Sequence, residues 1–182
     1  MRICWLTDLH LNRYPEFLNK RLIEKSRPFD ALLVTGDIST GFKTEEHIDF
    51  LKQFSSRVYF VLGNHDFYGS SFQEVESRVR HVCRDQRAAW LEDSSPIPLG
   101  RGTYLIGVDG WYDAMYGDSL FLDVNIDRMM IRDLLLKTRR EERSELIHAR
   151  AEASVESFKR KMAEVPRQAE KVIVATHYPP WI

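Results

Sequence analysis

Short apolar runs that end abruptly in polar residues recur along the chain, at residues 3–6, 31–34, 58–62 and 172–175. They are rich in β-branched and aromatic side chains, which is typical of strands buried in a sheet. Helical stretches at 15–25 and 44–54 separate the first three runs. This alternation of strand and helix at short spacing predicts βαβ units with parallel strands.

The centre of the chain carries further local signals. Ser71 and Glu74 form a capping-box pattern, which predicts a helix that continues to about residue 84. Prolines and glycines between residues 96 and 102 then break the chain, and residues 103–108 are predicted to form another strand.

Residues 127–165 are rich in charge and have helical periodicity. Residues 139–143 fit either a solvated helix face or a break between two helices. His148 extends the apolar stripe of the last helix, so we interpret it as a buried packing histidine rather than a catalytic one. The stripe itself consists of Ala151, Val155, Phe158, Met162 and Val165.

The composition fits one soluble globular domain over residues 1–182, since 43% of the residues are hydrophobic and 29% are charged. The 26 basic residues nearly cancel the 27 acidic ones. No global positive field therefore exists to gather nucleic acid or an anionic membrane, and any attraction for phosphate must be local.

Only two cysteines occur, Cys4 and Cys83, and they lie far apart in predicted strand and helix. This usage suits reduced thiols rather than a disulfide scaffold. The N-terminus has no signal-peptide pattern, and no apolar run is long enough to cross a bilayer. We therefore expect a cytoplasmic protein without membrane contact, while the sequence leaves its oligomeric state open.

Residues of metal-ligand type follow the predicted strands. Because parallel strands direct their carboxyl ends to one edge of a sheet, side chains at those ends can converge although they are distant in sequence. The fourth strand is expected to deliver its residues to the same edge. The residues concerned are Asp8 and His10, then Asp37, then Asn64, His65 and Asp66, and finally Thr176 and His177.

Carboxylate, imidazole and carboxamide ligands together suit two divalent ions of Mn, Fe or Zn, and the lack of thiolates argues against a structural zinc site. If the Asp37 carboxylate bridges two ions, Asp8 and His10 can hold the first ion. Asn64 and His177 can then hold the second. Taken singly, each of these residues is explained as well by turn or cap chemistry, and only the ordered set indicates metal ligation.

Two divalent ions carry about +4 and two carboxylates return about −2, so such a pocket attracts a phosphorylated substrate. The ions would also lower the pKa of a bridging water to give a hydroxide nucleophile at neutral pH. His65 is placed to protonate the leaving oxygen or stabilise its charge. Asp66 fits a turn cap nearly as well as a catalytic role.

Four motifs in order match a known family: D-x-H at 8–10, G-D at 36–37, G-N-H-D at 63–66 and T-H at 176–177. In this combination the chain resembles the calcineurin-like metallophosphoesterases. The resemblance implies an α/β fold, a β-sandwich flanked by helices in αββα layers, with a dinuclear metal site. It also implies His65 and Asp66 as a catalytic acid and its orienting partner, and as metal ligands Asp8, His10, Asp37, Asn64 and His177.

The sequence departs from the family pattern after the T-H motif. Family members carry a further G-H-x-H-like motif that adds one histidine to each metal, and neither histidine is present here. The other histidines, His47, His81 and His148, lie in predicted helices and do not replace it. We therefore expect a domain that is incomplete at its C-terminus, with apolar surface of the second sheet left uncovered.

Residues 111–165 are expected to supply a cap loop and a helical segment within the domain. Trp111, Tyr112 and Asp113 fit either a loop that reaches over the pocket or local packing.

The leading functional hypothesis is metal-dependent hydrolysis of phosphomonoesters or phosphodiesters. One alternative is a non-catalytic interaction module with a degenerate metal site, suggested by the missing motif. A DNA nuclease is a lesser alternative, because the near-neutral charge and the lack of a basic stripe count against it.

Overall fold

The computed structural model describes residues 1–113 and 125–179, and its first sheet is built from the apolar runs near the N-terminus. Its strands are β1 (Ile3–Leu6), β2 (Ala31–Thr35), β3 (Val58–Val61) and β4 (Ala88–Trp90), in that spatial order. All neighbouring strands are parallel, which confirms the βαβ prediction for the first three. The short strand β4 was not predicted, because Ala88–Trp90 offers only three residues of pattern.

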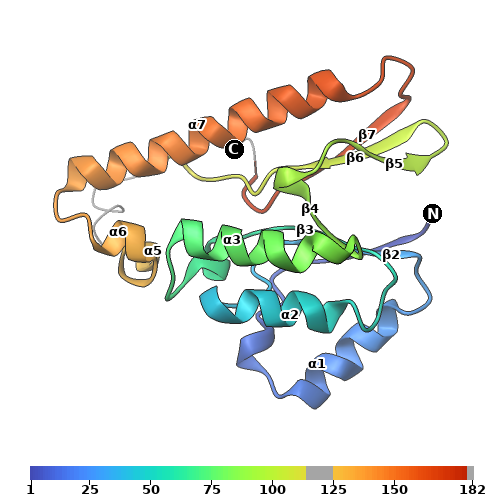
Figure 1. The fold of residues 1–182 in the computed structure, drawn as a ribbon, viewed down its shortest axis with the longest axis horizontal. Helices are drawn as coiled ribbons and strands as arrows, with labels where there is room; N and C mark the ends of the chain where they lie inside the picture. The colour runs from blue at the N-terminus through green and yellow to red at the C-terminus, as the bar shows by residue number, and fades with distance from the viewer. Residues whose placement is uncertain (114–124, 180–182) are drawn as a thin grey trace.

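Three helices cover the outer face of this sheet (Figure 1). They are α1 (Glu16–Ile23), α2 (Thr44–Leu51) and α3 (Phe72–Val82). The predicted capping box is present at the start of α3, where the Ser71 hydroxyl accepts from Glu74 N and Ser71 N donates to the Glu74 carboxylate. Short 3-10 turns at Leu11–Arg13, Glu24–Ser26, Gly41–Lys43, Asn64–Phe67, Cys83–Asp85 and Leu91–Asp93 complete the connections.

A second sheet contains β5 (Ile97–Gly100), β6 (Thr103–Gly107) and β7 (Lys171–Ala175). Strand β6 runs antiparallel to β5 and parallel to β7. The pattern of the run at 172–175 suggested a further strand of the first sheet. This prediction is wrong, because the run pairs with β6 in the second sheet. Strand β5 lies where the prolines and glycines predict a break in the chain. It contains Pro98, which an edge strand tolerates.

The two sheets pack face to face, with a small apolar core between them formed by residues such as Leu33, Val61 and Leu105. Part of this interface is uncovered. Trp5, on β1, is 68% exposed, and Ile173 on the edge strand β7 is exposed as well. Exposed apolar surface beside the second sheet agrees with the expectation from the sequence.

The charged segment forms three helices, α5 (Ile126–Met130), α6 (Arg132–Leu135) and the long α7 (Arg140–Glu164), which lies along the second sheet. The break between helices lies at residues 136–139, so of the stretch 139–143 only Arg139 belongs to it, while residues 140–143 form the first turn of α7. The αββα layering of the prediction is confirmed: helices α1–α3, two sheets and α7.

The predicted buried stripe of the last helix is wrong. Val155 is 50% exposed and Met162 is exposed too, whereas Ser157 and Lys161 are buried. The Lys161 ammonium donates to the backbone carbonyls of Leu91, Glu92 and Ser94, so a polar anchor decides which face of α7 turns inward.

His148, expected to be buried, is exposed on α7. Both cysteines are free, as expected. In the part of the chain that the structure describes, no helix combines the length and apolar character needed to cross a membrane.

Candidate metal centre

The backbone is strained where the first two strands end. Asp8, His10 and Asp37 have φ angles of 52°, 43° and 53°, in the left-handed region that side-chain-bearing residues seldom adopt. Such strain gathers at functional sites, where it turns side chains in directions that regular structure does not allow. Here it helps to direct carboxylates and an imidazole toward the rim of the first sheet.

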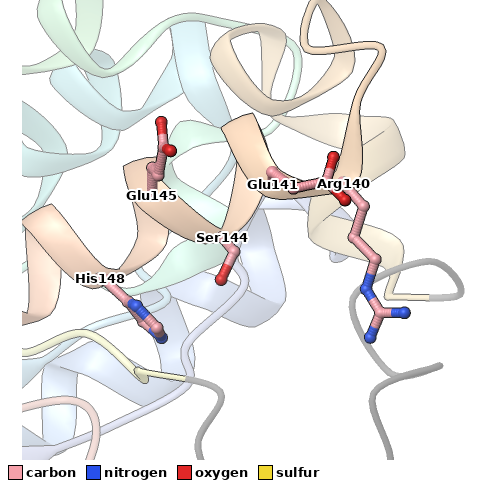
Figure 2. Close-up of a pocket in the computed structure, with 5 residues that line it drawn as sticks. All are labelled: Arg140, Glu141, Ser144, Glu145 and His148. Atoms are coloured by element: carbon pink, nitrogen blue, oxygen red, sulfur yellow. The ribbon is translucent and has the colours of Figure 1, made fainter.

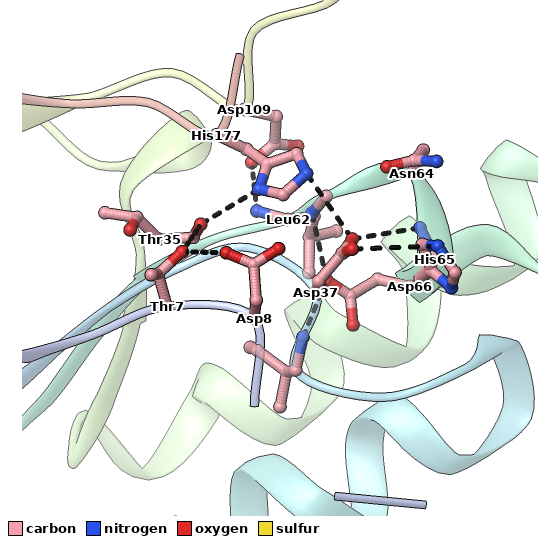
Figure 3. Close-up of polar contacts among 12 residues, drawn as sticks. Thr7, Asp8, Thr35, Asp37, Leu62, Asn64, His65, Asp66, Asp109 and His177 are labelled. Atoms are coloured by element: carbon pink, nitrogen blue, oxygen red, sulfur yellow. Dashed lines mark hydrogen bonds and ion pairs between the residues drawn. The ribbon is translucent and has the colours of Figure 1, made fainter. Parts of the chain in front are cut away.

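The Asp37 carboxylate is the centre of the cluster (Figure 3). The Nε2 atoms of His10, His65 and His177 lie 3.7, 3.8 and 3.5 Å from its oxygens. Asp37 is buried, and its Oδ1 also accepts a hydrogen bond from His65 N at 3.1 Å. Residues from three strand ends of the first sheet and from β7 of the second therefore meet at one carboxylate.

His177 is held in a tautomer suited to metal binding. Its Nδ1 lies 3.0 Å from the carbonyl oxygen of Thr35, to which only a protonated Nδ1 can donate. In the neutral ring, Nε2 is then the atom with the free lone pair, and it faces Asp37. A hydrogen bond of this kind on the far nitrogen is what orients metal-binding histidines.

The glycines of the G-D and G-N-H-D motifs make room for these side chains. A Cβ on Gly36 would collide with the His177 ring, and one on Gly63 would collide with the Asp37 carboxylate and with His177. The motif residues are therefore glycine because the Asp37 and His177 side chains fill the space that a Cβ would take.

The residues present fit divalent ions. The structure contains two groups of three residues whose ligand atoms, within each group, all lie within 4.8 Å of one another. One group is Asp8, Asp37 and His177, and the other is His10, Asp37 and His65. Asp37 belongs to both groups, as a bridging ligand must. The Nδ1 atoms of His10 and His65 are buried without a hydrogen-bond partner in the described structure, which is costly unless each ring gains another partner.

These groups differ from the pairing expected from the sequence. Asp8 lies with His177 rather than with His10, because His177 approaches from the second sheet. The His10 ring instead meets the His65 ring edge-on, with centroids 4.7 Å apart.

Asn64 follows β3 at the same rim. Its carboxamide nitrogen donates to Asp127 and to the Tyr68 hydroxyl, and Figure 3 shows its oxygen on the side that faces His177. The oxygen is therefore the end of the side chain directed at the cluster.

Asp66 is fully buried, and its carboxylate accepts mainly from the backbone, with one further contact from the Thr44 hydroxyl at 3.4 Å. It accepts from the amides of Ile38, Ser39 and Gly63 at 3.3, 2.8 and 2.9 Å. Burial raises the pKa of Asp66 to about 7, and these amide donors oppose the rise. Its contacts tie the loop after β2 to the loop after β3, which is the capping chemistry considered from the sequence; they include none to the His65 ring.

Sequence reasoning missed Asp109, which follows β6. Its buried carboxylate accepts from Leu62 N at 2.7 Å and from Trp90 Nε1 at 2.8 Å, and its carbonyl oxygen accepts from His177 N at 3.2 Å. Burial raises its pKa well above the ordinary value, and the nearby Glu92 carboxylate adds to that rise. Asp109 thus joins the two sheets beside His177. Its only local signal in the sequence is that it is a polar residue after a predicted strand.

Trp111 is buried by local packing. Its ring makes edge contacts with Phe67 and Phe72, at centroid distances of 6.0 and 5.4 Å, and the Arg150 guanidinium lies 5.3 Å from it. Tyr112 stacks on Trp111 at 5.5 Å. Residues 114–124 of the expected cap lie outside the described residues.

A hollow of about 340 Å³ lies on α7 and shares no lining residue with the cluster around Asp37 (Figure 2). One arginine, two glutamates, a serine and a histidine line it, and none of them belongs to the predicted metal-ligand set. The lining residues are Arg140, Glu141, Ser144, Glu145 and His148.

Gly63→Ala is expected to weaken divalent-metal binding by about 10- to 100-fold, because the new methyl group displaces Asp37 and His177. Titration calorimetry with Mn²⁺ measures the effect. Gly100→Ala in strand β5 is the matched control, since its Cβ would meet no atom within 4 Å although its positive φ costs stability. Equal metal affinity in wild type and Gly63→Ala would contradict the packing argument.

A family model for calcineurin-like phosphoesterases matches residues 1–181. Among solved structures, phosphopantetheinyl hydrolase (PptH) from Mycobacterium tuberculosis shares the fold, with a TM-score of 0.71 at 18% identity. The match covers 98% of this chain and 68% of that chain. No curated protein matches the sequence at a significant level. With the family motifs gathered at one rim and the family match spanning nearly all residues, the chain belongs to the calcineurin-like phosphoesterase family.

Proposed function

We propose that this chain hydrolyses phosphomonoesters or phosphodiesters with two divalent ions that share the Asp37 carboxylate. The observation that carries the proposal is the position of Asp37, with three imidazole Nε2 atoms within 3.8 Å of its oxygens. Separations of 3.5 to 3.8 Å exceed the usual hydrogen-bond range, and carboxylate and imidazole donors suit cations held between them.

The ligands proposed from the sequence keep their roles in this scheme. Asp8, His10, Asn64 and His177 surround Asp37 and would complete the hold on the two ions, and these donors suit Mn, Fe and Zn. When bound, the ions supply positive charge for a phosphate group and acidify a water molecule.

The other groups of the site act on the substrate or on the loops. His65, on the rim beside Asn64, gives its ring proton to the leaving oxygen as the phosphorus–oxygen bond breaks. Asp66 holds the two ligand loops in register through its backbone hydrogen bonds. Loop position matters because small displacements of catalytic groups are costly in rate.

The direct test is hydrolysis of aryl phosphate monoesters and diesters by the purified chain with Mn²⁺, alongside calorimetric counting of bound ions. Because the structurally similar hydrolase acts on a phosphopantetheinyl group by its name, a phosphopantetheinyl ester belongs among the diesters tested. We expect two ions per chain and hydrolysis that a chelator abolishes. Two bound ions without hydrolysis of any ester would overturn the catalytic proposal.

The alternative of a non-catalytic interaction module predicts that no ion binds at saturating Mn²⁺. A nuclease predicts cleavage of DNA ends under conditions in which the aryl esters remain intact. The balance of 26 basic and 27 acidic residues still disfavours the nuclease.

A further inference from the structure

A buried carboxylate outside the family motifs contacts the Asn64 side chain. Asp127, in the first turn of α5, is 3% exposed, and its Oδ1 accepts from Asn64 Nδ2 at 2.7 Å. The same oxygen accepts from the Tyr68 hydroxyl at 2.6 Å. The Tyr68 oxygen in turn accepts from Asn64 Nδ2 at 3.0 Å. Three side chains therefore form a closed ring of hydrogen bonds.

This ring allows only one orientation of the Asn64 carboxamide. A carboxylate can only accept hydrogen bonds, and the Tyr68 proton is already donated to Asp127. The Asp127 carboxylate and the Tyr68 oxygen therefore both act as acceptors toward Asn64, so the amide must present its NH₂ group to them. Its oxygen is then directed to the opposite side, toward His177 in Figure 3. A rotation by half a turn would place the amide oxygen against a buried carboxylate, which is costly.

The segment that carries Asp127 is fixed to the loop that follows Asn64. Gly69 N donates to the Met130 carbonyl at 2.7 Å, and Arg132 N donates to the Ser70 carbonyl at 3.0 Å. Phe72 N donates to the Asp133 carboxylate at 2.8 Å. These bonds join two parts of the chain separated by some 60 residues, so Asp127 keeps its place beside Asn64.

We propose that Asp127 is a positioning residue, which locks the Asn64 carboxamide with its oxygen directed at the metal centre. The inference rests on the proposed function in one respect, that Asn64 is a ligand of a metal ion. Asp127 itself touches neither substrate nor ion in this scheme, and it acts entirely through Asn64. The helical segment at 126–135 thereby contributes to the metal site from outside the two sheets.

The first test measures Mn²⁺ affinity by calorimetry for Asp127→Ala in two backgrounds, native and Asn64→Ala. In the native background, we expect Asp127→Ala to lower the affinity for the ion held by Asn64 by about 10- to 100-fold. When Asn64 is already alanine, we expect the affinity to fall by less than about twofold. Asp127→Asn should largely restore affinity, because its amide oxygen still accepts from Asn64. Asp133→Ala is the matched control, since it loosens the same segment without touching Asn64.

An equal loss of affinity in both backgrounds would overturn the proposal, because Asp127 would then act by another route. An equal loss of Mn²⁺ affinity in Asp133→Ala would also overturn the proposal. The effect of Asp127→Ala would then come only from loosening the segment that carries it.

A second readout needs no metal. In the metal-free protein, the Asn64 side-chain NH₂ resonances, assigned by their loss in Asn64→Ala, should exchange slowly with solvent. In Asp127→Ala they should exchange at least about tenfold faster, as expected when a partly buried hydrogen bond opens. Unchanged exchange would overturn the positioning role. If the wild type binds no ion, the proposed function fails, while this exchange measurement still decides whether Asp127 orients Asn64.

Discussion

Asp37→Asn is expected to lower kcat/KM for aryl phosphate hydrolysis by about 10³-fold or more, equivalent to about 4 kcal/mol of transition-state stabilisation. The substitution removes the one negative charge that faces His10, His65 and His177 together. Under the proposed function, neither ion would be held firmly without that charge. The amide oxygen of asparagine can still accept from His65 N, so the fold should persist.

The measurement combines steady-state kinetics in Mn²⁺ with metal analysis of the dialysed protein and circular dichroism. Asp49→Asn provides the control, because it makes the same chemical change at an exposed aspartate on α2. A kcat/KM within about tenfold of wild type in Asp37→Asn would remove Asp37 from the centre of the site.

The second large effect is expected in stability. Asp109→Ala should lower the free energy of unfolding by about 2 to 5 kcal/mol, because it leaves the buried donors Leu62 N and Trp90 Nε1 without an acceptor. The loss falls where the two sheets are joined. Denaturant unfolding followed by tryptophan fluorescence measures it.

Asp109→Asn is the matched variant, since its amide oxygen can still accept from both donors. Burial raises the pKa of Asp109 strongly, so a neutral side chain suits the position, and we expect a loss below about 1 kcal/mol. If Asp109→Asn unfolds as easily as Asp109→Ala, acceptor geometry is not the reason for the aspartate.

The strands and helices around the site could be predicted because their signals are local. The run at 31–35 is buried on both faces and reads as a central strand in its own residues. The α3 start is fixed by two residues, Ser71 and Glu74, that bond to each other's backbone. The strand-end motifs likewise stand in the sequence itself. The structure brings Asp8, Asp37 and His177 to one rim, although it groups Asp8 with His177 rather than with His10.

Tertiary structure decided what depends on residues distant in sequence. Strand β7 has the same pattern as β1, yet it pairs with β6, and nothing within the five residues of β7 specifies that partner. The inward face of α7 is likewise set by Lys161, which finds carbonyl acceptors about 70 residues earlier in the chain.

The same limit explains the two aspartates that sequence reasoning missed. Asp109 meets Leu62 across 47 residues, and Asp127 meets Asn64 across 63. A carboxylate reads in sequence as a turn or cap residue until its donors are known. The sequence by itself therefore determined which residue types stand at the strand ends, while the packing of two sheets and one helical segment decided which way those side chains point. Hydrogen-bond partners are fixed by proximity in space, and a linear pattern records only proximity along the chain.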